Sequence, residues 1–222
     1  MSKMVWDQAG ERIYETGVEQ CALFVRDSSG KYSKGVPWNG VSNITESPSG
    51  AEPTKLYAND GTYVTMMSAE ELGGSIEAYT YPDEFAQCDG SVALTEGVYI
   101  GQQTRSTFGL AYKSLIGNDV VGTDYGYKLH LVYGCLASPS EKAHATVNDS
   151  PEAGTMSWEY ATTPVAVAGR KPTASVTIDS TKVNKEKLAA LEAIIYGSDD
   201  VEARLPLPDE IATLMGTTGT EG

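Results

Sequence analysis

Long apolar runs are absent from this 222-residue sequence, and their absence limits where the chain can fold. No stretch approaches the ~18 consecutive apolar residues that a membrane-spanning helix requires. The N-terminal segment "MSKMVWDQAGERIYE" also lacks the apolar core of a signal peptide. We therefore expect synthesis and folding in a cytoplasm, with no membrane partner.

Cysteine and histidine are scarce. The three cysteines, Cys21, Cys88 and Cys135, are far apart and form no C-x-x-C pair. They lie in or beside apolar segments, which predicts buried, reduced thiols rather than a redox or metal site. Neither His130 nor His144 has a metal-type partner at the spacing of one strand or helix face. We expect both histidines to be structural or exposed, and we expect no cofactor.

Catalytic and nucleotide-binding motifs are missing as well. The chain has no G-x-S-x-G elbow, no G-x-G-x-x-G fingerprint and no phosphate-binding G-x-x-x-x-G-K-[ST] loop. Adjacent acids at 70–71, 83–84 and 199–200 leave a glycosidase-type carboxylate pair as the remaining enzymatic alternative. With 30 acidic residues such neighbours are expected by chance, so we predict that the protein is not an enzyme.

Basic residues are few, and the net charge is −14 (16 basic against 30 acidic). The imbalance is concentrated in residues 61–165, which hold 4 basic and 13 acidic residues. An acidic surface of this kind repels phosphate, which argues against tight nucleic-acid binding. It is also a common way to keep a protein in solution.

Period-two alternation dominates residues 20–178 and predicts an antiparallel, strand-rich unit. In "YKLHLVYGCL" it places Tyr127, Leu129, Leu131, Tyr133 and Cys135 on one face. The segments "RSTFGLAYKSLI" and "TMSWEYATT" alternate in the same way. Turn signals between these segments include Asp-Gly at 60–61 and 89–90.

Helix is expected only near the C-terminus. "NKEKLAALEAIIYG" predicts an amphipathic helix over residues 184–196, with Asn184 as its cap and Gly197 ending it. A second short helix is expected to start near Pro208. Residues 217–222 are expected to be disordered. The chain lacks repeats and linkers, so we predict a single domain over residues 1–222.

The stretch from Gly35 to Gly61, "GVPWNGVSNITESPSGAEPTKLYANDG", contains four glycines and three prolines. We expect a long loop without structure of its own between two strands. Loops of this length inside a compact domain are usually functional or disordered. Mobile loops that order against a neighbouring molecule are typical of self-assembling proteins.

Several segments resemble the major tail proteins of bacteriophages with long, non-contractile tails. They are "GAEPTKLYANDGTYV", "YPDEFAQCDG", "KLHLVYGCLASPSEKAHATVNDSPEAGTMSWEYATTPV" and "ARLPLPDEI", which occur in the same order and span roughly residues 35–212. The resemblance implies an antiparallel β-sandwich with a flanking helix. It also implies hexameric rings that stack into a hollow tail tube, assembled in the bacterial cytoplasm and carried in the virion.

The resemblance implies partners as well. Besides further copies of the chain, these are a tape-measure protein in the lumen, and terminator and distal tail proteins at the two tube ends. Genome DNA would pass through the lumen without specific binding. Edges of strands that lack protection would pair between subunits.

Two groups of residues follow as candidate sites. The family's long loop reaches from one ring to the next, and residues 35–61 match it in position and composition. We expect this loop to be mobile in the monomer and ordered in the tube. Its expected inter-ring contacts are Trp38, Asn39, Tyr57, Asn59 and Asp60. The expected lumen-facing acids, which would repel the DNA backbone, are Glu77, Asp83 and Glu84.

Three other functions stay open from the sequence. A β-sandwich that binds carbohydrate or protein could use some of the 13 tyrosines. A glycosidase-like enzyme would rely on the scattered carboxylates. A distal tail, terminator or head protein would share the resemblance but would not form concentration-dependent tubes.

Overall fold

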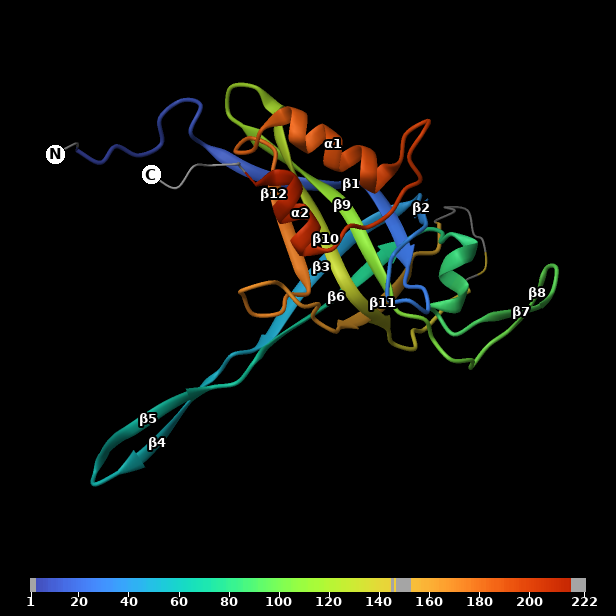
Figure 1. Ribbon diagram of the computed structural model, residues 1–222, viewed down its shortest axis with the longest axis horizontal. Coiled ribbons are helices and arrows are strands. Elements are labelled where there is room, and N and C mark those ends of the chain that lie inside the picture. The colour runs from blue at the N-terminus through green and yellow to red at the C-terminus, as the bar shows by residue number, and fades with distance from the viewer. Residues whose placement is uncertain (1–2, 145, 147–152, 217–222) are drawn as a thin grey trace.

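The computed structural model describes residues 3–144, 146 and 153–216 (Figure 1). The predicted disorder of residues 217–222 lies outside these residues. The strands are β1 (Ile13–Val25), β2 (Gly35–Pro37), β3 (Val41–Gly50), β4 (Pro53–Ala58), β5 (Gly61–Met67), β6 (Glu70–Ala78), β7 (Val92–Thr95), β8 (Val98–Ile100), β9 (Phe108–Asn118), β10 (Gly122–Ala137), β11 (Met156–Thr162) and β12 (Ser175–Asp179). The helices are the short 3₁₀ helix η1 (Asp83–Gln87), α1 (Lys185–Tyr196) and α2 (Pro208–Met215).

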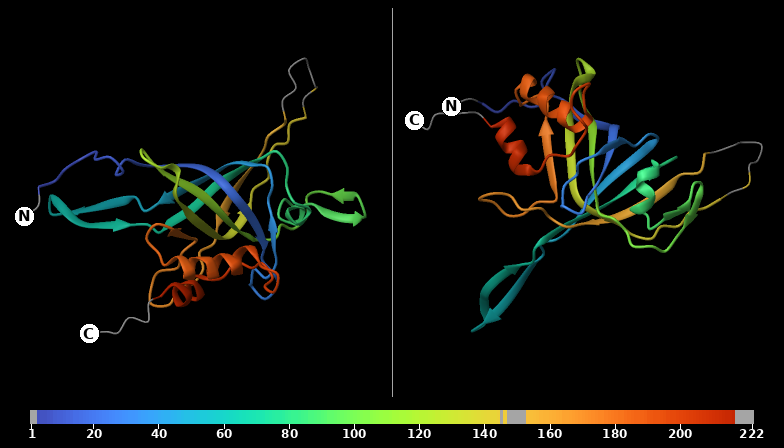
Figure 2. Two further views of the ribbon diagram at one scale, coloured as in Figure 1. Left: turned by 90° about the horizontal axis from the view of Figure 1, so that it is seen from above. Right: turned by 45° about the vertical axis from the view of Figure 1, so that its right-hand side comes forward.

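The fold is mainly β and antiparallel, as the alternation predicts. One large sheet has the strand order β2-β1-β9-β10-β11-β6-β3, and β12 pairs with the middle of β10. Two separate two-stranded sheets, β4–β5 and β7–β8, project from it. The sheet curves so that one face encloses a core while α1 and α2 cover part of the other face (Figures 1 and 2).

An aromatic cluster fills the inner face of the curved sheet. Phe85 of η1 lies at its centre, with ring centroids 4.5 Å from Trp38, 5.2 Å from Trp158 and 5.5 Å from Phe108. Phe85 itself is fully buried. Aromatic pairs with tilted or edge-to-face geometry stabilise a core beyond their burial alone. The cluster therefore joins strands that are far apart in sequence.

The two helices form the second layer, as the sequence predicts. Leu188, Leu191 and Ile195 of α1 are buried in a core that also contains the sheet residues Leu129 and Leu131. The Asn184 side chain accepts hydrogen bonds from the backbone N–H groups of Glu186 and Lys187, and so caps α1. Gly197 follows with φ 82°, and Pro208 is the first residue of α2.

The alternation along β10 changes face near its end. Leu129, Leu131 and Tyr133 pack under the helices, but Cys135 lies in the aromatic core on the opposite face. The cause is a register shift between Val132 and Cys135, where Gly134 has φ 63°. One extra residue in a strand reverses the direction of every side chain that follows. The prediction that Cys135 shares a face with Tyr133 is therefore wrong.

The prediction of a structureless loop over residues 35–61 is also wrong. This stretch forms β2, β3 and β4, and only short turns separate these strands. β3 pairs with β6 over its whole length, from Val41 opposite Ala78 to Gly50 opposite Glu70. The glycines and prolines lie at turns and on an edge strand, where both residue types are tolerated.

Candidate functional site

The most unusual surface of the molecule is the β4–β5 hairpin, residues 51–69, which we call the arm. Every residue of β4 and β5 is exposed. The views in Figures 1 and 2 agree that the arm extends well away from the body. The arm is therefore held by its own two-stranded ladder and by its attachment to β3 and β6. Isolated two-stranded hairpins are at best marginally stable in water.

Large apolar side chains on the arm face solvent. They are Leu56, Tyr57, Tyr63, Val64, Met66 and Met67, with exposures from 40% to 77%. Covering such a side chain contributes about 1–2 kcal/mol. The arm thus carries a surface whose burial would favour association.

The ladder is interrupted at the root of the arm. The β3–β6 ladder ends where Gly50 lies opposite Glu70, and the β4–β5 ladder starts where Pro53 lies opposite Met67. Between them, the backbone N–H of Ala51 donates to the carbonyl of Ala69 over 3.4 Å. Gly50 and Ala51 both have positive φ. The regular ladder of the body therefore does not continue into the arm.

The tip of the arm contains three of the predicted contact residues. Asn59 and Asp60 have φ values of 50° and 60° and form a two-residue turn between Ala58 and Gly61. Positive φ at both central residues is the type I′ geometry of tight hairpins. The turn is therefore centred on Asn-Asp rather than on the expected Asp-Gly pair. Tyr57, beside the turn, is 70% exposed.

The other two predicted contacts do not lie on the arm. Trp38 is 3% exposed, and its Nε1–H donates to the carbonyl of Thr80 over 2.8 Å. The side chain of Trp38 therefore has almost no exposed surface for a contact with another subunit, and the prediction for Trp38 is wrong. Asn39 is exposed, but it precedes β3 while the arm follows β3. The ten-residue strand separates the two by about 30 Å.

The predicted lumen acids are close in sequence but differ in surroundings. Glu77 lies near the end of β6, next to the buried Ile76 and Ala78, and is half-buried. Asp83 and Glu84 occupy the exposed first turn of η1, not a strand. Their position relative to a lumen stays a prediction.

Sequence reasoning missed the apolar residues of β5, because the expected loop was taken to end at Gly61. A signal for them is present in the sequence. A turn-forming "ANDG" lies between two runs rich in strand-forming residues, "TKLY" and "TYVTMM", a pattern typical of a β-hairpin. Tyr63, Val64 and Met66 therefore belong to the candidate interface with Tyr57.

The end strand β3, and the strand β1 that β2 covers only at Ala22–Phe24, carry features that discourage pairing with a further strand. β3 contains Pro48, which has no N–H to donate. β1 has irregularities around Gly17 and Gln20, both with positive φ. By contrast, β5 is seven residues long and has no proline and no charged residue. Of these edges, β5 is the one open to pairing with another chain.

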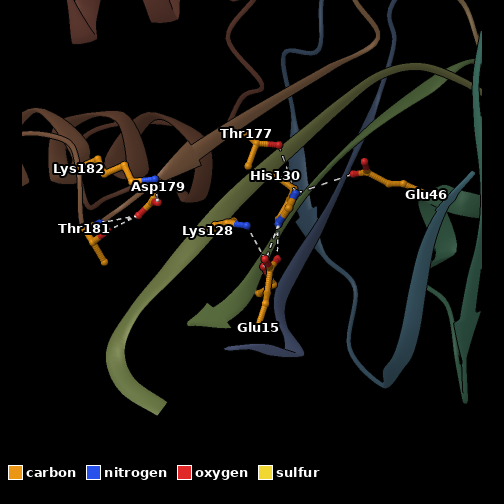
Figure 3. A network of polar contacts seen from close by, with 9 residues as sticks. Glu15, Glu46, Lys128, His130, Thr177, Asp179, Thr181 and Lys182 are labelled. Atoms are coloured by element: carbon orange, nitrogen blue, oxygen red, sulfur yellow. Dashed lines mark hydrogen bonds and ion pairs between the residues drawn. The ribbon is translucent and has the colours of Figure 1, made fainter. Parts of the chain in front are cut away.

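A polar cluster lies on the inner face of the large sheet (Figure 3). His130 stacks on Tyr112 with ring centroids 4.7 Å apart, and its Nε2 lies 2.9 Å from the Oγ of Ser114. Glu15 accepts hydrogen bonds from the Ser114 hydroxyl over 2.5 Å and from Lys128. The Tyr112 hydroxyl donates to Glu46 over 2.6 Å. The cluster borders a hollow of about 390 Å³.

This cluster resembles a Ser-His-acid triad in composition but not in geometry. The hydroxyl hydrogen of Ser114 goes to Glu15, so the imidazole Nε2 donates to the serine rather than accepting its proton. The Nδ1 atom is 3.9 Å from Glu46, too far for the hydrogen bond that orients a catalytic histidine. The arrangement joins β1, β3, β9 and β10 but does not activate Ser114 as a nucleophile.

The pKa values in the cluster follow from burial and contacts. Burial is the largest influence on His130 and lowers its pKa, outweighing the carboxylates of Glu46 and Glu15. Burial acts to raise the pKa of Glu15, but hydrogen bonds from Lys128 and Ser114 outweigh it, so the pKa is lowered. At neutral pH the cluster therefore contains a neutral imidazole and an ionised Glu15.

A larger groove of about 830 Å³ lies between β1, the β2–β3 segment and α1. Its wall includes an ion pair between Lys113 and Glu192, with a nitrogen–oxygen distance of 2.7 Å. The Lys113 ammonium also lies 4.2 Å from the ring centroid of Tyr127. Lys113 and Glu192 are thus paired with each other, and Trp38, which also lines the groove, is buried.

Burial agrees with the expected state of the cysteines. All three thiols are free and buried, and burial raises the pKa of Cys21 and Cys88 to about 12.

Among the described residues, no group of three or more potential ligands is placed to hold a metal ion. Within the same residues, no helix has the length and apolarity needed to cross a bilayer. No protein-family model and no curated protein matches the chain.

Proposed function

We propose that this protein is a structural subunit that assembles with copies of itself into hexameric rings, stacked as the hollow tail tube of a bacteriophage. The observation that carries the proposal is the arm, an exposed hairpin with an apolar surface and an uncharged edge at β5. Within residues 3–144, 146 and 153–216, nothing in a single copy pairs with this edge or covers this surface, whereas a second copy would cover both. The sequence resemblance supplies the ring symmetry and the tube.

The rest of the proposed assembly follows from the same resemblance. A tape-measure protein occupies the lumen, terminator and distal tail proteins close the ends, and the virion is the final location. Genome DNA passes through the lumen, where the net charge of −14 per subunit opposes adhesion of the phosphate backbone. Glu77, Asp83 and Glu84 remain the proposed lumen acids.

The carbohydrate-binding alternative finds less support in the surface. Aromatic residues with large exposure occur on the arm, on the β7–β8 hairpin and near the N-terminus, for example Tyr63, Tyr99 and Trp6. They are spread over separate projections rather than gathered on one rigid sheet face. Trp38, which borders the larger groove, is buried.

Negative-stain electron microscopy across a protein concentration series tests the proposal. We expect hollow tubes of uniform width, or stacked rings, above a threshold concentration of the wild-type chain. Tyr63→Asp places a charge on the 77% exposed arm residue and should abolish tubes without changing the melting temperature. Ala190→Asp, which adds the same charge to the exposed side of α1, is the matched control.

Three outcomes would count against the proposal. One is a protein that stays monomeric at every concentration, even when preformed tube fragments are added as nuclei. A second is single rings that never stack, which would favour a terminator or distal tail protein. The third is equal tube formation by Tyr63→Asp and wild type, which would remove the arm from the assembly.

A further inference from the structure

The β7–β8 hairpin is a second exposed ribbon, and no other strand in the described part of the chain pairs with it. Its strands span Val92–Thr95 and Val98–Ile100, and all seven residues are exposed. The large apolar ones are Val92, Leu94, Val98, Tyr99 and Ile100, with exposures from 40% to 65%. The hairpin base is fixed to the body, because the N–H of Ser91 donates to the carbonyl of Ala86 over 2.8 Å.

Both ribbons lack a third strand. Each has only two strands, and three or more strands are needed for a sheet to be stable without other support. Neither β5, β7 nor β8 contains a charged residue or a proline. Each ribbon therefore offers an open edge with the features that favour pairing to another chain.

The ribbons project from opposite ends of the molecule. In Figure 1 and in the view from above in Figure 2, β4–β5 points to the left and β7–β8 to the right. They therefore cannot pair within one chain. A contact between unlike surfaces of two copies is heterologous, so it repeats from copy to copy and either closes a ring or continues a stack.

We propose that the β5 edge of one copy pairs with the β7–β8 hairpin of a second copy, forming a four-stranded sheet between them. This inference rests on the proposed self-assembly and names the surface of the second copy to which the arm binds. The β5 edge is favoured over the β4 edge because β4 contains Pro53 and Lys55. In the large sheet, the end strand β3 contains Pro48, and β1, which β2 covers only in part, is irregular at Gly17, so neither offers the arm a regular edge.

Charge and side-chain chemistry fit this pairing. No charge has to be buried in the pairing, because β5, β7 and β8 contain no charged residue; the charges of the arm are Glu52, Lys55 and Asp60, and the β7–β8 hairpin has Glu96 in its turn. The strands to be paired present Tyr63 and Val64 on one side and Val98 and Tyr99 on the other. Aromatic and β-branched cross-strand pairs are among those that stabilise sheets most.

Intermolecular cross-linking of two variants, each with one added cysteine, tests the pairing. Thr65→Cys places a thiol on β5, and Thr95→Cys places one on β7 directly opposite Val98 of β8, so that the thiol is close to either edge of the hairpin; both positions are exposed. The native cysteines are at most 7% exposed, so the new thiols are the accessible ones. The two proteins are mixed, allowed to assemble, treated with a short bismaleimide and separated on a denaturing gel. Thr65→Cys mixed with Ala190→Cys is the control.

We expect a cross-linked heterodimer from Thr65→Cys with Thr95→Cys in assembled tubes, and none from the control mixture. We also expect Val98→Asp to raise the concentration for half-assembly by about tenfold or more, while leaving the melting temperature unchanged. Tubes that form without a Thr65–Thr95 cross-link would overturn the pairing and leave the tube proposal intact. If no assembly and no cross-link form at any concentration, both proposals fail.

Discussion

At the scale of single residues, the environment of a side chain decides its role more than its chemical type does. His130 and Ser114 have the composition of a nucleophilic site, yet the serine donates its hydrogen to Glu15. Trp38 looked like a contact residue in a flexible loop, yet it lies against Phe85 in the core. In both cases partners distant in the sequence determine the outcome.

His130 leads to a prediction on pH. Burial, the largest cause, lowers its pKa below the ordinary value of 6.5, so the unfolded chain binds this proton more tightly than the folded protein does. The stability associated with neutral His130 is therefore present above pH 6.5 and is lost as the pH falls below that value towards the lower folded pKa. Wild type should unfold at less urea at about pH 5.5 than at about pH 7.5.

The contribution of His130 is isolated by comparing two variants. His130→Gln should lose less stability over this pH interval, measured as the change in urea midpoint. His144→Gln, at the exposed second histidine, should behave like wild type. Equal losses in wild type and His130→Gln would show that another group is responsible.

At the scale of elements, the arm is the feature whose behaviour should depend most on neighbours. It consists of one exposed ladder joined to the body through an interrupted pairing at residues 51 and 69. Such a hairpin opens readily, because few buried contacts oppose its opening. The central strands β9 and β10 of the body, in contrast, are paired on both sides and pack on the two cores.

We predict that arm amides exchange with solvent much faster in the monomer than in the tube. Hydrogen exchange measured by mass spectrometry on peptides from β5 would show this difference. Peptides from β9, which is paired on both sides by β1 and β10, serve as the internal reference and should be protected in both states. Equal protection of β5 in monomer and tube would contradict an interface on the arm.

At the scale of the whole molecule, charge and apolar surface oppose each other. A ring of six subunits would carry 6 × −14 = −84 formal charges. Salt screens such repulsion, with a Debye length of about 8–10 Å near physiological ionic strength. The exposed apolar residues of the arm and of β7–β8 provide the attraction, which salt does not weaken in this way.

Assembly should therefore become easier as salt increases. Raising sodium chloride from about 0.02 M to about 0.3 M should lower the concentration at which tubes form, as followed by light scattering and electron microscopy. The control is the Tyr63→Asp variant, which should not assemble at either salt concentration. A threshold that rises with salt would instead indicate that charge pairs hold the copies together.

The fold class was predictable from the sequence, because alternation and capping signals depend on neighbours along the chain. The strand character of residues 20–178, the cap at Asn184 and the start of α2 at Pro208 are of this kind, and the structure has them. The arm was missed because glycine, proline and serine were taken to indicate a loop. Its hairpin signal around Asn59 and Asp60 was nevertheless present in the sequence.

What the sequence by itself determined is therefore local: the mainly β composition, the two C-terminal helices, the reduced cysteines and the acidic balance. Only the tertiary structure decided which side chains meet, because these contacts join residues far apart in the chain. It buried Trp38, shifted Cys135 to the other face at the Gly134 bulge, and enclosed His130 between Glu15 and Glu46. It also placed the two exposed ribbons, β4–β5 and β7–β8, at opposite ends of the molecule, where they cannot pair with each other within one chain.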